Sequence, residues 1–204
     1  MERESELALV DRLREGDAAA FDAVCAEFHR PLYNFLARLS RSRDVAEDLL
    51  EETWLRLVGH ARRLAPDTRL KPWLFSVARN LYASYCRSRV LDQSLSADVL
   101  GLWPTSPLEP SPFEQAAAGE LERALERALA RLPVPYREVL LLVAAGFTSP
   151  EAAAVCGTTP EAIRQRLSRA RAMLSRAMGR DVARQDEAAR APGVVRRRRE
   201  NEAG

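Results

Sequence analysis

The sequence predicts an all-α protein with two small helical domains joined by a proline-rich linker. Apolar residues recur at helical spacing through most of the 204 residues, and no run alternates as a strand would. Prolines and serines crowd residues 91–112, and this composition disfavours helix and favours an extended linker. We therefore expect one domain over residues 5–90, a linker over 91–113, a second domain over 114–179 and a disordered basic tail over 180–204.

Capping residues and prolines divide the first domain into helices. Asp17 suits the position before a helix, because its side chain can accept a hydrogen bond from a free backbone amide of the first turn. Asp44 and Glu47 resemble a capping box. We expect five helices in this domain. The first ends before Gly16, the second is capped by Asp17, and the third begins at Pro31. The fourth begins at Asp44 and ends near Leu64, and the fifth runs from Pro72 to about Arg89.

Residues that mark helix ends divide the second domain in the same way. Glycines at 146, 157 and 179 fall where helices are expected to end. Thr148 and Thr159 are candidate caps, and Pro160 suits the first position of a helix. The predicted helices cover roughly residues 114–131, 135–145, 149–156 and 160–178.

The net charge of +2 looks neutral, but the charges are segregated along the chain. Residues 69–89 and 159–180 each carry +5, whereas residues 44–52 carry −5 and residues 91–112 carry −3. The near-zero mean therefore does not argue against a nucleic-acid partner.

The helices after Gly146 form a helix-turn-helix pattern with a basic second helix. Apolar residues at 163, 167, 170 and 174 place one face of that helix on the core. The residues left outside are Arg164, Gln165, Ser168, Arg169 and Arg171. Arginine can bond guanine and glutamine can bond adenine in the major groove. An ordinary solvated helix is the alternative, but such a face usually mixes both signs of charge, so DNA binding is favoured.

An acidic stripe marks the first domain. Its members fall at helical spacing and are Asp44, Glu47, Asp48, Glu51 and Glu52. The helix dipole can explain acidic residues in the first turn, but it cannot explain Glu51 and Glu52. Binding to a basic protein partner is the more specific interpretation of this acidic stripe.

Residues 69–89 are basic and interleaved with aromatic side chains, which are Trp73, Phe75, Tyr82 and Tyr85. Cations with aromatic platforms suit single-stranded nucleic acid, because they neutralise phosphates and stack bases. The alternative is that the aromatic side chains belong to the core, as Leu74, Val77, Ala78 and Leu81 are expected to do. The pattern alone leaves both interpretations open.

Taken in order, these segments resemble bacterial RNA polymerase sigma factors of the extracytoplasmic-function group within the sigma-70 family. The resemblance covers roughly residues 5–178 and rests on five segments. They are Gly16-Asp17-x-x-Ala20-Phe21, Leu32-Tyr33-x-Phe35, the acidic run from Asp44 to Arg56, Lys71-Pro72-Trp73-Leu74-Phe75-Ser76-Val77-Ala78-Arg79-Asn80, and Leu129-x-x-Leu132-Pro133 with Arg137 followed by Gly146 to Arg171.

The resemblance implies a role for each segment. The first domain corresponds to sigma region 2, where Asp48, Glu51 and Glu52 would bind the coiled coil of the polymerase beta-prime subunit. The same domain would recognise and melt the minus-ten element through Arg69, Lys71, Trp73, Arg79 and Asn80. The second domain corresponds to sigma region 4, which would read the minus-thirty-five element through Arg164, Gln165, Ser168, Arg169 and Arg171. The acidic linker would thread through the polymerase cleft.

The resemblance also implies partners and a location. We expect core RNA polymerase, promoter DNA and an anti-sigma factor as partners, with no small-molecule substrate and no cofactor. A cytoplasmic site of action is expected, since the chain shows neither a signal peptide nor an apolar run long enough to span a membrane. An anti-sigma partner could hold it at the membrane.

Two other function classes compete with this one. A helix-turn-helix transcription regulator acting without polymerase docking would explain the second domain but neither the acidic stripe nor residues 69–89. An enzyme is disfavoured because the sequence shows no catalytic nucleophile with its base, no phosphate loop and no metal-ligand spacing.

Overall fold

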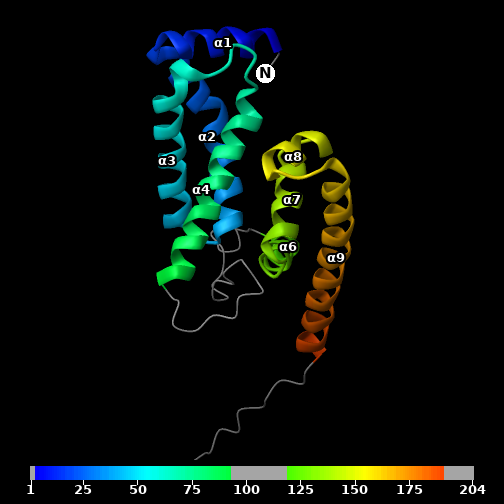
Figure 1. Ribbon diagram of the computed structural model, residues 1–204. Helices are drawn as coiled ribbons and strands as arrows, with labels where there is room; N and C mark the ends of the chain where they lie inside the picture. Colours follow the sequence, from blue (N-terminus) through cyan, green and yellow to red (C-terminus); the bar gives the residue numbers. More distant parts are fainter. Residues whose placement is uncertain (1–2, 93–118, 191–204) are drawn as a thin grey trace, which may run out of the picture.

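The computed structural model describes residues 3–92 and 119–190, and within these ranges every regular element is a helix. The prediction of an all-α fold is confirmed, while the proline-rich linker lies outside the described residues. Figure 1 shows two helical groups lying side by side. In chain order the elements are α1 (Arg3–Glu15), α2 (Ala18–Ser40), α3 (Arg43–His60), the 3-10 turn η1 (Ala61–Arg63), α4 (Leu70–Asp92), α6 (Glu120–Ala130), α7 (Val134–Ala144), α8 (Ser149–Cys156) and α9 (Pro160–Arg190).

The N-terminal domain, α1 to α4, is a bundle in which α2, α3 and α4 run alongside one another and α1 lies across one end (Figure 1). Asp17 caps α2, as predicted, and its carboxylate accepts a hydrogen bond from the Ala19 amide at 2.8 Å. The buried face of α3 is also the predicted one, and its members are Ala46, Leu49, Leu50, Thr53 and Leu57.

The helix break predicted at Pro31 is wrong, because α2 continues through it. Phe28 and Leu32 are buried on either side of the proline, whose own side chain is exposed. Proline removes one helical hydrogen bond, which is tolerable where a continuous apolar face holds both halves against the core.

The predicted cap of α3 at Asp44 is also wrong, because the helix begins at Arg43 and its cap lies two positions before Asp44. Ser42 is the capping residue, and its hydroxyl lies 3.4 Å from the Val45 amide. Asp44 stands in the first turn, where a negative charge interacts favourably with the helix dipole. Glu47 pairs with Arg43 at 2.9 Å instead of closing a capping box.

The C-terminal domain, α6 to α9, contains the predicted helix-turn-helix, formed by α8 and α9. The bounds of α8 agree with the predicted 149–156, and Gly157 closes it with a φ of 62°, a left-handed conformation that glycine adopts without strain. The Thr159 hydroxyl caps α9 by accepting from the Ala162 amide at 3.2 Å. The predicted end near residue 178 is wrong, because α9 continues through Gly179 to Arg190.

The two domains share one apolar core rather than standing apart. Phe75 of α4 is fully buried, and its ring centroid lies 5.2 Å from that of Phe35 in α2 and 4.9 Å from that of Phe147 after α7. In addition, α4 lies against α8, and α2 lies against α7 (Figure 1). Phe75 therefore belongs to the bundle and to the contact between domains at once.

Candidate nucleic-acid interface

The outward face of α3 carries the predicted acidic site. Asp48 and Glu51 are exposed, and Glu52 is partly exposed beside Arg56, whose Nε lies 2.8 Å from its carboxylate. These residues stand opposite the buried face of α3, so the part of the chain that the structure describes covers little of the acidic surface.

Two large apolar side chains extend this face, and the predicted site does not include them. Leu55 is 58% exposed and Val58 is 59% exposed. Both lie outside the helical stripe that runs through Ala46, Leu50 and Leu57, so their spacing in the sequence already marked them as surface residues. Exposed apolar groups beside charges are typical of a protein-binding surface.

The predicted minus-ten residues divide between two faces of α4. Trp73 and Asn80 line an outward hollow of about 330 Å³, together with Arg56 and His60 from the end of α3. The Trp73 and His60 rings lie 6.3 Å apart between centroids. The hollow combines aromatic faces, an amide and a cation, which suits a single unstacked base.

The other three residues of that set point toward the C-terminal domain. An Nη of Arg69 lies 2.7 Å from the Glu151 carboxylate in α8. The Lys71 ammonium donates to the Ala145 carbonyl at 2.6 Å and lies 4.8 Å from the centre of the Phe147 ring. These two cations therefore do not share the hollow around Trp73.

Arg79 makes the most buried of these contacts. Its Nε donates to Glu138 of α7 at 2.9 Å, and the glutamate side chain is only 2% exposed. A buried carboxylate of this kind needs its cation, since removing one partner of such a pair leaves the other charge unpaired. Arg79 thus has a role in joining the domains, in addition to the DNA contact that the sequence suggests.

Two of the four aromatic side chains are core residues. Phe75 is fully buried and Tyr82 is 4% exposed, so neither presents a ring for stacking. Burial is also the main reason that the pKa of Tyr82 is raised. Trp73 and Tyr85 remain partly exposed, and the Arg89 guanidinium lies 5.8 Å from the centre of the Tyr85 ring. The interpretation that these aromatic side chains belong to the core is therefore correct for Phe75 and Tyr82, which are two of the four.

The outward face of α9 presents all five predicted residues. Arg164, Gln165, Ser168, Arg169 and Arg171 are exposed. Ile163 and Ala170 are fully buried, so they fix the rotation of the helix. The Arg164 Nε donates to Glu161 at 3.1 Å, and this contact is the main reason that the pKa of Glu161 is lowered. Arg164 is thereby held at the first turn of α9, where a recognition helix meets base edges.

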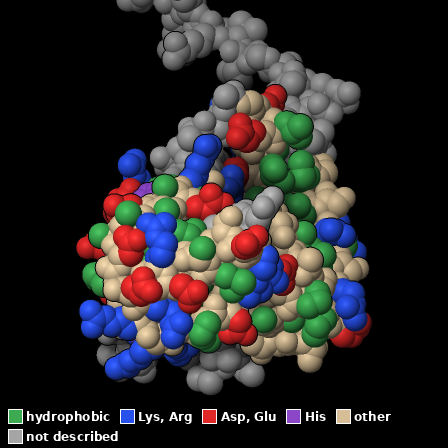
Figure 2. All heavy atoms as spheres, turned by 90° about the horizontal axis from the view of Figure 1, so that it is seen from above, with side chains coloured by type: hydrophobic (Ala, Val, Ile, Leu, Met, Phe, Trp, Pro, Cys, Tyr) green, Lys and Arg blue, Asp and Glu red, His purple; other side chains and the backbone are tan. Residues whose placement is uncertain are grey.

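The end of the molecule formed by α1 and α8 differs from the outward face of α9 in its charge. Figure 2 shows Lys and Arg side chains interspersed with Asp and Glu over this face, without a large area of one sign. A mixed surface of this kind attracts DNA weakly, because the phosphate backbone responds to summed positive charge. The α9 face is therefore the stronger candidate for contact with duplex DNA.

Glu151 stabilises the start of the helix-turn-helix. Its carboxylate accepts hydrogen bonds from the Thr148 amide at 2.9 Å and from the Thr148 hydroxyl at 2.7 Å. The Thr148 amide, then its hydroxyl and the charge of Arg69, hold the pKa of Glu151 below its ordinary value. A lowered pKa means that the folded state favours the ionised form.

We expect Glu151→Ala to lower the free energy of unfolding by about 1 kcal/mol at pH 7, as loss of a capping interaction does. The contribution is full above the ordinary pKa of 4.5 and disappears as the pH falls through the lowered folded value. Urea denaturation at pH 7 and pH 3 measures it. Glu151→Gln is the matched control, since it keeps an acceptor for the amide. An equal loss for Glu151→Ala at both pH values would contradict the account.

Metal and membrane features are absent from the parts of the chain that the structure describes. Within residues 3–92 and 119–190, no group of three His, Cys, Asp or Glu side chains is placed to hold a metal ion. No helix in the described ranges is both long and apolar enough to cross a bilayer.

Family comparisons match both domains. Residues 25–90 match the family described as sigma-70 region 2, and residues 122–174 match sigma-70 region 4. These segments contain α3, α4 and the helix-turn-helix, so the matches cover the acidic face of α3, the hollow on α4 and the outward face of α9.

Individual relatives match most of the chain. The ECF RNA polymerase sigma factor EcfG of Rhodopseudomonas palustris is 36% identical, with 83% of this chain and 86% of the relative covered. The sigma factor CarQ of Myxococcus xanthus is 32% identical over 83% of this chain and 95% of its own length. A solved structure of the sigma factor RpoE with the anti-sigma factor NepR from Bartonella quintana superposes with a TM-score of 0.63 at 28% identity, covering 78% of this chain and 96% of that one.

Proposed function

Because the chain belongs to the extracytoplasmic-function group of the sigma-70 family, we propose that it binds core RNA polymerase and directs it to promoters through contacts with the minus-ten and minus-thirty-five elements. Sigma factors are not enzymes, so the proposed function depends on surfaces that bind the polymerase and promoter DNA rather than on catalytic residues. One observation supports the proposal most strongly: a single chain carries three separate surfaces of the kinds that the function needs. They are the acidic outward face of α3, the hollow beside Trp73 on α4 and the basic outward face of α9.

We assign polymerase docking to the outward face of α3. The face combines the carboxylates of Asp48, Glu51 and Glu52 with the exposed apolar groups of Leu55 and Val58. Such a surface suits a helical partner that brings basic side chains to the acids and apolar side chains to the leucine and valine. The coiled coil of the beta-prime subunit is the proposed partner.

We assign the minus-ten element to α4. A base extruded from the non-template strand would enter the hollow between Trp73 and His60, where Asn80 can hydrogen-bond its edge. Extrusion costs a few kcal/mol, which stacking and hydrogen bonds in the pocket offset. Arg69, Lys71 and Arg79 would bind the phosphates on either side of that base, once they are free of the C-terminal domain.

We assign the minus-thirty-five element to the outward face of α9. Arg164 and Gln165 stand in its first turns, where side chains reach base edges in the major groove. Arg169 and Arg171 are placed further along, where contacts to phosphate are expected. The first pair would supply specificity, and the second pair would supply affinity.

This division leads to a testable difference between two substitutions in α9. Gln165→Ala is expected to reduce discrimination among duplex sequences by about 1–3 kcal/mol at one base pair. Arg169→Ala is expected to weaken binding to all duplexes alike. It is also expected to reduce the slope of the logarithm of the binding constant against the logarithm of salt concentration by about one. Selection from a randomised duplex pool, followed by salt titration, measures both effects. A change of sequence preference in Arg169→Ala, with none in Gln165→Ala, would reverse the assignment.

An anti-sigma factor and a cytoplasmic site of action complete the proposal. The Bartonella quintana relative is solved with its anti-sigma factor NepR, which supports a protein of that class as a partner here. Polymerase and promoter DNA both reside in the cytoplasm, so we expect the chain to act there.

Co-elution of the purified chain with core RNA polymerase tests the proposal. A sigma factor is expected to comigrate with the core enzyme in gel filtration at micromolar concentration. A helix-turn-helix regulator that acts without polymerase docking would elute separately while still binding duplex DNA through α9. Separate elution would therefore reject the proposal and favour that second function.

A further inference from the structure

The loop that precedes α4 is anchored at its two ends by apolar side chains. Leu64 and Leu70 are buried, whereas the residues between them are exposed or half-buried. A hydrogen bond from the Thr68 amide to the Ala65 carbonyl, at 2.9 Å, closes a turn within the loop itself. Apolar packing therefore holds the ends of the loop, and polar contacts must hold residues 65–69 against the bundle.

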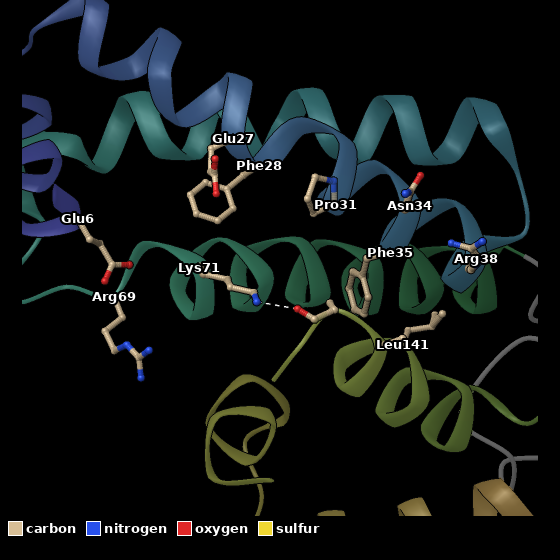
Figure 3. Close-up of a pocket in the computed structure, with 12 residues that line it drawn as sticks. Glu6, Glu27, Phe28, Pro31, Asn34, Phe35, Arg38, Arg69, Lys71 and Leu141 are labelled. Carbon is tan, nitrogen blue, oxygen red and sulfur yellow. Dashed lines mark hydrogen bonds between the residues drawn. The ribbon is translucent and has the colours of Figure 1, made fainter. Parts of the chain in front are cut away.

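Helix α1 supplies two such polar contacts. Arg3 donates through Nη2 to the Asp67 carbonyl at 2.7 Å, and its Nη1 lies 2.8 Å from the Glu6 carboxylate. The other oxygen of Glu6 accepts a hydrogen bond from the Leu70 amide at 2.9 Å, and the Glu6 side chain is only 11% exposed. Figure 3 shows Glu6 reaching from α1 toward the chain at Arg69, just before α4 begins. Both contacts to the loop join residues that are 64 positions apart in the sequence.

Glu6 caps α4 in place of the residue that precedes this helix. Arg69 occupies the capping position, since its carbonyl accepts the first helical hydrogen bond, from the Trp73 amide at 3.1 Å. An arginine side chain has no acceptor atom, so it cannot bind the free amides of the first turn. The carboxylate of Glu6 binds one of these amides and places a negative charge at the positive end of the helix dipole. A side chain of α1 therefore holds the first turn of α4.

The capped turn forms one wall of the hollow that the proposed function gives to an extruded base. Trp73 lies in this turn, and its ring centroid is 6.3 Å from that of His60 at the end of α3. Residues 61–69 connect these two walls. Helices fray at their ends, and fraying of an uncapped α4 would displace Trp73 from His60. The shape of the hollow thus depends on Glu6, although Glu6 is not among the residues that line it.

We propose that Glu6, together with Arg3, is a positioning residue for minus-ten recognition, because it holds the first turn of α4 and the preceding loop in the arrangement that receives the base. This inference rests on the proposed function, since it takes the hollow beside Trp73 as the base site. It gives a role in base selection to α1, which lies outside the match to sigma-70 region 2 that begins at residue 25. A cap that only stabilised the fold would leave the choice of base unchanged.

Base preference in the holoenzyme tests the inference. Core RNA polymerase carrying the full chain selects from a randomised pool of short single-stranded DNA, and the bound strands are sequenced. Glu6→Ala is expected to reduce enrichment of the preferred base at the most selective position by about fivefold, the size of effect expected when a helix cap is lost. Glu6→Gln keeps an oxygen that can accept from the Leu70 amide, so it is expected to retain most of the wild-type preference. An equal loss in both variants would contradict capping of that amide by Glu6.

Glu4→Ala is the matched control, because it makes the same change of charge at an exposed position of α1, and it is expected to leave base preference unchanged. Arg3→Ala is a second test variant in case Glu6→Ala does not fold, since it removes the contact to the Asp67 carbonyl from a more exposed position. Its enrichment of the preferred base is expected to fall by about twofold. Circular dichroism and duplex binding through α9 check that each variant is folded.

The outcomes separate this inference from the proposed function. If the folded variants among Glu6→Ala and Arg3→Ala select the same bases as the wild type, even with a lower yield of bound strand, the inference is wrong. An equal loss of preference in Glu4→Ala would also contradict it, because it would show a general effect of charge. If the wild-type holoenzyme enriches no sequence beyond core polymerase alone, the proposed minus-ten function itself is rejected.

Discussion

Reversing Asp48 and Glu52 together to arginine is expected to weaken binding to core RNA polymerase by at least about 100-fold, which corresponds to about 2.7 kcal/mol. Both side chains stand on the outward face of α3, opposite the buried residues of that helix. A basic partner surface would then meet two like charges, and repulsion at an interface costs several kcal/mol.

The fold is expected to survive this double reversal. Among residues 3–92 and 119–190, these two positions make one ion pair, the largely exposed one between Glu52 and Arg56, and exposed pairs contribute about 0–1 kcal/mol. Duplex binding through α9 should therefore remain at the wild-type level, which separates loss of docking from loss of structure.

Asp11→Arg with Glu15→Arg is the matched control for this experiment. It makes the same change of net charge at two exposed positions of α1, away from α3. Surface plasmon resonance with immobilised core polymerase measures all three proteins. Equal weakening by both double variants would show a general charge effect rather than docking by α3.

Replacing Phe75 by alanine is expected to lower the free energy of unfolding by about 3–5 kcal/mol, the range for a buried phenylalanine. Its ring is fully buried and contacts both Phe35 and Phe147, so the cavity would open at the junction of the two domains. A loss of this size is a large part of the 5–15 kcal/mol that stabilises a typical protein.

Chemical denaturation followed by circular dichroism measures this loss. Leu55→Ala is the control, because it removes an apolar side chain of similar length from a position that is 58% exposed, and it is expected to change stability by no more than about 0.5 kcal/mol. A loss below about 1 kcal/mol for Phe75→Ala would mean that the two domains do not share a core at this residue.

Much of the fold followed from local physical signals in the sequence. Asp17, Gly157 and Thr159 mark helix ends through hydrogen bonds and backbone angles that depend on few neighbours. The buried face of α3 followed from helical spacing alone. Local rules failed at Pro31 and Gly179, where helix continues through a residue that usually interrupts it. Burial against neighbouring helices explains the first case, since tertiary packing overrides intrinsic propensity.

The candidate site was predictable in composition but not in arrangement. The sequence indicates that Arg69, Lys71 and Arg79 form a basic group near Trp73, and it cannot show which of them another domain engages. Glu138 and Glu151 lie far away in sequence and are brought to α4 only by tertiary contacts. Leu55 and Val58 could have been found, because both depart from the apolar stripe of α3.

Mapping of transcript starts shows whether this chain directs core RNA polymerase to promoters. Core RNA polymerase is incubated with fragmented genomic DNA, with and without this chain, and the 5′ ends of the transcripts are sequenced. We expect start sites that require the chain and share two sequence elements, centred about ten and thirty-five base pairs upstream of each start. Transcripts that start at the same positions with and without the chain, or that share no upstream elements, would contradict this expectation.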